Sequence, residues 1–195
     1  MTSQFSQHKA VAKELSQVWG SYGRLRALLA SPFFHVSVVI SVMSSGAWLT
    51  RDWWTTGMSV VPALLGFSVA TFAVFVAIGD DKFRTVLASG GHGKVRALVD
   101  IYSSFLMLIG VQVIGLLLSL IASSRPLTSL LMLAGIELGE LTDPVRDMLR
   151  LVAGAFRFIG WLFVIYSVIA VIPMSLSVYR MAKLYLGHLL KGSLK

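Results

Sequence analysis

The chain has 195 residues, of which 56% are hydrophobic and only 13% are charged, and its mean hydropathy is +0.78. This composition is far from that of a soluble globular domain and indicates an integral membrane protein. The absence of cysteine excludes disulfides, thiolate metal sites and cysteine nucleophiles. The net charge of +8 is better explained by basic residues that flank membrane spans than by nucleic-acid binding.

Residues 1–30 are predicted to form an amphipathic helix on the cytoplasmic side of the membrane. Apolar side chains recur at spacings of three and four, at Val11, Leu15, Val18, Tyr22, Leu25 and Leu29. Arg24 and Arg26 lie off this stripe. A basic amphipathic segment is typical of binding to anionic lipid at the interface, and a docking surface for a soluble partner or for neighbouring copies is the alternative.

Four apolar runs follow, each near the about 20 residues that cross a hydrocarbon layer about 30 Å thick. They lie at residues 33–50, 57–79, 101–121 and 158–178. We therefore predict an all-α fold, an integral membrane four-helix bundle over residues 31–179. A basic helical tail at 180–195 completes the chain.

The basic residues predict the orientation. They gather in the N-terminal segment, in the loop after the second span and at the C-terminus, which places both termini in the cytoplasm. Trp48, Trp53 and Trp54 then belong to an outer aromatic belt. Asp100 and Arg157 fall at opposite ends of their spans, so we expect interfacial contacts for each and no ion pair between them. The predicted contacts with a cytoplasmic partner or anionic lipid are Arg24, Arg26, Lys82, Arg84, Lys94 and Arg96.

Small residues form one stripe on the second span, at Gly66, Ala70, Ala73 and Ala77. Such a stripe lets helix backbones approach closely in lipid, where packing drives association. Packing within the monomer is the favoured interpretation, and self-association is the second.

Gln112 lies near the middle of the third span, where its amide cannot reach bulk water. It must hydrogen-bond to another helix or face an aqueous cavity. A bond between helices is favoured over a pore-lining role.

The third outer loop carries Glu137 and Glu140, which would draw cations to the outer mouth of an oligomeric pore if they formed a ring. A solvated polar turn is the commoner explanation. In the following segment, Asp143 is predicted to be a helix N-cap with Pro144 at the first helical position.

Pro173 predicts a kink in the fourth span, because it leaves the carbonyl of Ile169 without its helical donor. Ser175 and Ser177 are candidates to satisfy the freed groups.

Enzymatic motifs are absent from the sequence. The GGHGK stretch at residues 90–94 has the wrong glycine spacing for a phosphate loop and lacks a Ser or Thr after the lysine. The four histidines lie in separate segments without metal-ligand spacing. We therefore expect neither an enzyme nor a cofactor or metal site.

The stretch LLGFSVATFAVFVAIGDDKFR at residues 64–84, together with four spans and basic cytoplasmic flanks, resembles small multi-pass membrane subunits of bacterial anti-phage defence systems, such as the Kiwa membrane component. The resemblance implies a homo-oligomer of four-helix subunits in the bacterial inner membrane that senses infection or perturbs the membrane and works with a cytoplasmic partner. It carries over no functional residue.

Two hypotheses on function follow. In the first, the chain is an oligomeric membrane sensor or scaffold whose basic cytoplasmic surfaces hold a soluble effector. In the second, a homo-oligomer forms an ion-conducting or depolarising pore, lined by Gln112 and serines of the first and third spans.

Overall fold

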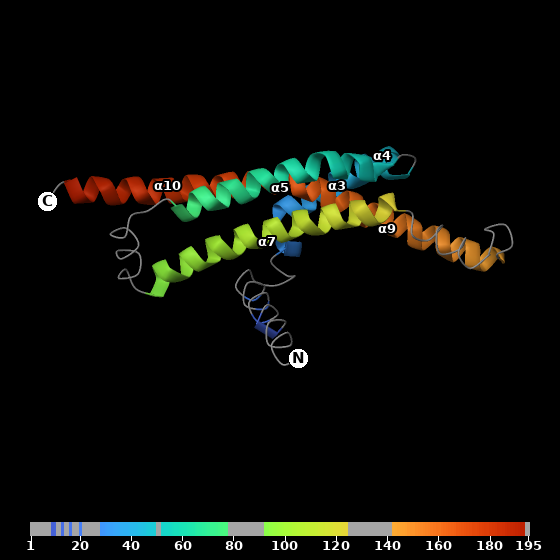
Figure 1. Ribbon diagram of the computed structural model, residues 1–195, viewed down its shortest axis with the longest axis horizontal. Helices are drawn as coiled ribbons and strands as arrows, with labels where there is room; N and C mark the ends of the chain where they lie inside the picture. The colour runs from blue at the N-terminus through green and yellow to red at the C-terminus, as the bar shows by residue number, and fades with distance from the viewer. Residues whose placement is uncertain are drawn as a thin grey trace. The chain divides into compact units, whose positions relative to one another are not determined.

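The computed structural model describes residues 28–49, 52–77, 92–124 and 142–193, together with Lys9, Ala10, Lys13, Ser16 and Gly20. Within these residues every regular element is an α-helix, as Figure 1 shows, so the predicted all-α class is confirmed. Three stretches are long and apolar enough to cross a membrane, at Trp53–Val74, Ile101–Ser123 and Asp143–Arg180. Most of the predicted amphipathic segment 1–30 lies outside the described residues.

The chain divides into two compact units. Unit 1 consists of Met1–Pro32, Gly66–Gly110 and Ala170–Lys195, and unit 2 consists of Phe33–Leu65 and Val111–Ile169. The helices at residues 53–77 and 92–123 therefore contribute to both units.

The first predicted span is two helices and not one. Helix α3 covers Pro32–Met43 and α4 covers Ser45–Leu49, with a turn at Ser44 between them. The Ser44 hydroxyl donates to the Ile40 carbonyl at 2.7 Å, and the Ala47 N–H bonds the Ser44 carbonyl at 2.9 Å, which closes a tighter turn than an α-helix allows. At 12 residues, α3 alone is too short to cross the hydrocarbon layer.

The next two helices contain the second predicted span up to Ala77 and the whole of the third. Helix α5 covers Trp53–Ala77 and remains one element although Pro62 lies inside it. Helix α7 covers His92–Ser123 and begins well before the predicted span. Its 32 residues extend over about 48 Å at about 1.5 Å per residue, more than the hydrocarbon layer requires.

The last span is divided between α9, Asp143–Ile169, and α10, Val171–Ser193. The interruption at Ala170 lies one turn before Pro173, which has no N–H to offer the Ile169 carbonyl. Ser175 and Ser177 donate their hydroxyls to the carbonyls of Val171 and Pro173, at 2.9 and 2.8 Å, and not to that of Ile169.

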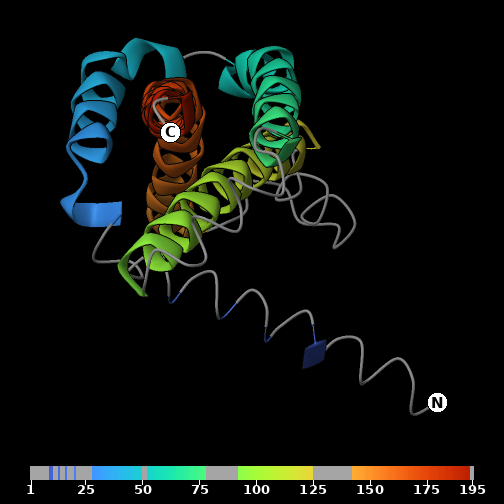
Figure 2. The same cartoon turned by 90° about the vertical axis from the view of Figure 1, so that its left-hand side faces the viewer.

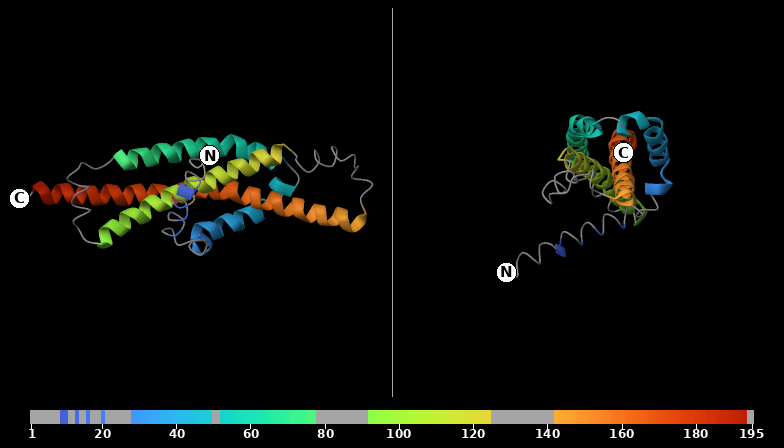
Figure 3. Two further views of the ribbon diagram at one scale, coloured as in Figure 1. Left: turned by 60° about the horizontal axis from the view of Figure 1, so that its bottom comes forward. Right: turned by 90° about the vertical axis from the view of Figure 1, so that its right-hand side faces the viewer.

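In unit 2, α9 lies between the α3–α4 pair and the N-terminal part of α5 (Figures 2 and 3). A core of buried side chains joins α5, α7 and α9, formed by Trp53, Val61, Ala122, Trp161 and Val164. Burial of such side chains stabilises a membrane bundle through packing, because lipid is itself apolar.

Two glycines allow the closest helix approaches in this core. A β-carbon at Gly57 of α5 would collide with the Ser119 side chain of α7, and one at Gly160 of α9 would collide with the Trp53 indole of α5. At Gly115 of α7, a β-carbon would meet Phe163 of α9 at an ordinary 3.5 Å. These contacts link α5, α7 and α9 pairwise within unit 2.

Candidate functional site at the contact of α4 and α9

Helix α4 and the turn before it are tied to α9 by two side-chain hydrogen bonds. The Trp161 indole N–H donates to the Ser44 hydroxyl at 2.8 Å, and the Arg157 guanidinium donates to the Leu49 carbonyl at 3.1 Å. Both donors come from α9, and both acceptors lie more than a hundred residues earlier in the chain. We call these two bonds, with the ring contact below, the α4–α9 contact.

Aromatic rings complete the α4–α9 contact. The rings of Trp48 and Phe158 meet edge to face, with centroids 5.4 Å apart and an interplanar angle of 67°. This T-shaped arrangement is favoured by the ring quadrupoles. The Trp48 indole N–H also donates to the Ser41 carbonyl at 2.9 Å, so the same side chain contacts α9 and caps a carbonyl next to the turn.

Trp53, which the sequence predicted for an outer aromatic belt, is packed among the described helices. Its side chain is 1% exposed and packs against Gly160 and Phe156, whereas Trp48 and Trp54 are only partly buried at the edge of the same core. Trp53 is large enough to fill the space that Gly160 leaves between α5 and α9, which explains its position in the interior. Its indole nitrogen has no hydrogen-bond partner among the described residues.

Arg157 contacts the C-terminal end of α4. The sequence predicted that this side chain reaches the interface, and it is exposed, but it also bonds the carbonyl of the last residue of α4. The final carbonyls of a helix lack internal donors and carry partial negative charge, so a cation there is favourable. Asp100 lies in α7, and its side chain is outside the described part.

Gln112 is fully buried, at 0% exposure, in α7. Neither its amide nitrogen nor its amide oxygen has a hydrogen-bond partner among the described residues. The predicted bond to another helix is therefore not present in that part of the chain. Because the side chain lies inside the chain's own fold, a pore between subunits would not be lined by Gln112 in this arrangement.

Serines supply most of the remaining buried polarity of unit 2. The hydroxyls of Ser37, Ser119 and Ser167 donate to carbonyls one turn earlier in their own helices, at 2.8, 2.9 and 2.7 Å. The Ser41 hydroxyl has no partner among the described residues. The buried polar side chains of the described part are serines and Gln112, so its interior offers hydrogen bonds and no acid–base pair. Among the described residues there is also no group of His, Asp and Glu side chains that could hold a metal ion.

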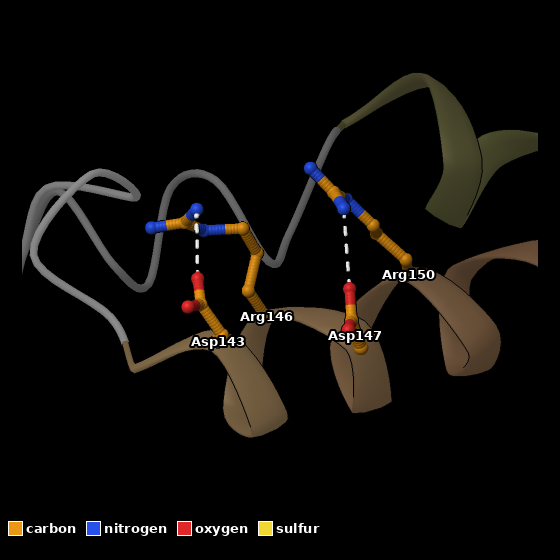
Figure 4. A network of polar contacts seen from close by, with 4 residues as sticks. All are labelled: Asp143, Arg146, Asp147 and Arg150. Carbon is orange, nitrogen blue, oxygen red and sulfur yellow. Dashed lines mark hydrogen bonds and ion pairs between the residues drawn. The ribbon is translucent and has the colours of Figure 1, made fainter.

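The N-terminal turns of α9 carry two ion pairs, shown in Figure 4. Arg146 meets Asp143 at 3.4 Å and Arg150 meets Asp147 at 3.1 Å. Exposed pairs of this kind contribute little to stability. The helix begins one residue before the predicted position, because the Thr142 carbonyl accepts the Arg146 N–H at 3.0 Å. Thr142 thus occupies the N-cap, and Asp143 lies in the first turn, where its charge suits the helix dipole.

The predicted stripe on α5 faces away from the core. Gly66, Ala70, Ala73 and Ala77 are all exposed, and a β-carbon at Gly66 would meet nothing within 4 Å. The buried residues of α5, including Gly57, Val61 and Ser68, lie on the opposite side of the helix. The stripe therefore does not pack against the described helices of this chain.

The remaining predicted contacts are placed only in part. Lys94 and Arg96 lie in the first two turns of α7, and their side chains are not among those described. The others fall outside the described residues: Arg24, Arg26, Lys82, Arg84, Glu137 and Glu140.

The glycine contacts at Gly57 and Gly160 were missed by the sequence analysis. A glycine inside an apolar run is the signal that could have indicated them, because glycine lowers helix propensity but lets another helix approach closely.

In comparisons with protein-family models, curated proteins and solved structures, no match to this chain was found.

Proposed function

We propose that this chain is a multi-pass protein of the bacterial inner membrane that acts as an oligomeric scaffold or sensor and holds a soluble effector at the cytoplasmic face. It crosses the bilayer four times, at about residues 33–50, 57–79, 101–121 and 158–178, and both termini are cytoplasmic. The observation that carries the proposal is the continuation of two apolar helices into basic helical segments.

These segments belong to unit 1. Helix α7 begins at His92, so Lys94 and Arg96 lie in the same helix, before its apolar part. Helix α10 continues to Ser193 and carries the exposed side chains of Arg180 and Lys183, with no acidic residue along its length. The N-terminal end of α7 and the C-terminal end of α10 point the same way within this unit (Figures 1 and 3). Rigid, basic extensions on the cytoplasmic side suit a partner with an acidic surface.

The exposed stripe of α5 supports an oligomer. Gly66, Ala70, Ala73 and Ala77 present small side chains that the described residues leave uncovered. A second copy can approach such a face closely in lipid, where small residues favour helix association. A role in anti-phage defence is supported by the resemblance of residues 64–84 to membrane subunits of such systems.

Cross-linking in intact bacteria tests the scaffold. We expect soluble proteins to be cross-linked to the full chain and to be lost when Arg180 and Lys183 are both replaced by glutamine. The matched control replaces Arg146 and Arg150, which the proposed topology places on the outer side, and should leave the cross-links unchanged. Cross-links that survive the first pair of substitutions, or that link only lipid, would contradict the proposal.

A further inference from the structure

The first apolar segment is long enough to form one straight helix, although the structure divides it into two. A single helix from Pro32 to Leu49 would be about 27 Å long at about 1.5 Å per residue, close to the about 30 Å of a hydrocarbon layer. The segment contains no charged residue and no proline after Pro32. Its Ser44, Ser45 and Gly46 lower the helix propensity at the break but do not prevent a continuous helix. In the structure it is divided at Ser44, and α3 alone covers only about 18 Å.

Contacts from α9 support the break, in addition to the bond within the segment from the Trp48 indole N–H to the Ser41 carbonyl at 2.9 Å. Trp161 of α9 bonds the Ser44 hydroxyl at the turn, and Arg157 bonds the carbonyl at the end of α4. The ring of Trp48 rests edge to face on Phe158. These partners draw α4 towards α9 and away from the axis of α3.

The turn itself is compatible with a straight helix. The Ser44 hydroxyl donates to the Ile40 carbonyl one turn earlier, a bond that serines also make inside continuous helices. If the Trp161 bond is lost, the Ser44 hydroxyl no longer accepts that hydrogen bond, but it still donates one to the Ile40 carbonyl. A β-carbon built at Gly46 would meet nothing within 4 Å, so the surroundings of Gly46 do not block a straight helix.

We propose that residues 32–49 are a two-position element: a broken helix when the α4–α9 contact is formed, and one straight membrane-spanning helix when Trp161 releases Ser44. The thickness of the bilayer biases the two positions, because the straight form matches a thick hydrocarbon layer and the broken form matches a thin one. The inference goes beyond the scaffold function and supplies the moving part of a membrane sensor. It rests on the placement of α3 in the membrane and not on any partner.

Spin-label distances in the full chain test this proposal directly. The chain has no cysteine, so Val36→Cys and Leu49→Cys can be labelled without background. Both side chains are about half exposed, at 49% and 51%. In a straight helix the two positions are about 20 Å apart along the axis, and a change of direction at Ser44 shortens this distance.

The labelled chain is reconstituted in phosphatidylcholine bilayers whose hydrocarbon layers are thinner or thicker than about 30 Å. We expect the shorter distance to dominate in thin bilayers and the population near about 20 Å to grow in thick ones. Trp161→Phe keeps an aromatic ring but loses the N–H donor, and should raise the ratio of straight to broken forms about five-fold, the effect of one net hydrogen bond.

Two further variants provide a second test of the same bond and a control. Ser44→Ala removes the acceptor of the same bond and should shift the ratio in the same direction even if Trp161→Phe folds poorly. Ser59→Ala removes an α5 hydroxyl that bonds within its own helix at 3.0 Å, and should change nothing. Distances that do not respond to either variant at the α4–α9 contact, or that are the same in thin and thick bilayers, would overturn the inference. Because no partner is present, these results are independent of the scaffold test.

Discussion

The indole of Trp53 lies against the bare α-carbon of Gly160, so closely that no β-carbon fits between them. This contact sets the separation of α5 and α9 in unit 2. It also places a tryptophan in the interior of the bundle, where it is the largest fully buried side chain among the described residues.

Gly160→Ala should destabilise the fold. The added methyl group meets ring carbons of Trp53 that belong to a packed core, and overpacking of this kind costs about 1–3 kcal/mol. Thermal unfolding in mild detergent measures the change. Gly154→Ala is the matched control on the same helix, because a β-carbon there meets nothing within 4 Å. It should be neutral or stabilising by about 0.4–1 kcal/mol. Equal melting temperatures for the two variants would contradict the packing described above.

Arg157→Gln should loosen α4. Glutamine keeps an N–H donor on a shorter side chain, but it loses the positive charge that interacts favourably with the C-terminus of α4. We expect the backbone amides of α4 to exchange with deuterium about five-fold faster, which corresponds to about 1 kcal/mol for one net hydrogen bond. Arg150→Gln, which breaks only an exposed ion pair within α9, should leave α4 unchanged. Exchange that responds equally to both variants would show that Arg157 does not hold α4.

The sequence was informative about helices and less so about their contacts. The apolar runs over α5 and α7 predict helices because length and hydropathy are local properties, and Pro173 predicts an interruption because its missing N–H is local too. The turn at Ser44 and the end of α4 are contacted by Trp161 and Arg157, which are distant in the chain. No periodicity in residues 33–50 contains that information.

The burial of Gln112 could also be anticipated, since a polar residue in mid-span has to avoid lipid. Its hydrogen bonding could not, because the partner depends on the register of neighbouring helices. The same holds for the stripe at Gly66: small side chains identify a contact face, but they do not say whether the contact is with the same chain or with another.

Gln112→Leu distinguishes two roles for the buried amide. If Gln112 joined helices within the chain, its removal would cost about 1–3 kcal/mol. In the structure neither amide atom has a partner among the described residues, so an apolar side chain of similar size should be neutral or stabilising. Thermal unfolding in detergent measures the difference, and Gln112→Met provides a second apolar variant of similar length. A clear loss of stability in both would show that the amide is paired in the membrane.

Gly66→Leu should separate association from folding. A large side chain in the small-residue stripe of α5 blocks close approach of a second helix, whereas the described residues leave this position open. We therefore expect native mass spectrometry in mild detergent to show fewer oligomers and an unchanged melting temperature for the monomer. Val76→Leu adds bulk at an exposed position of the same helix and is the control, since it lies about 80° around the helix from Gly66. Loss of monomer stability in Gly66→Leu would mean that the stripe packs within the chain, and an unchanged oligomer would place the interface on another face.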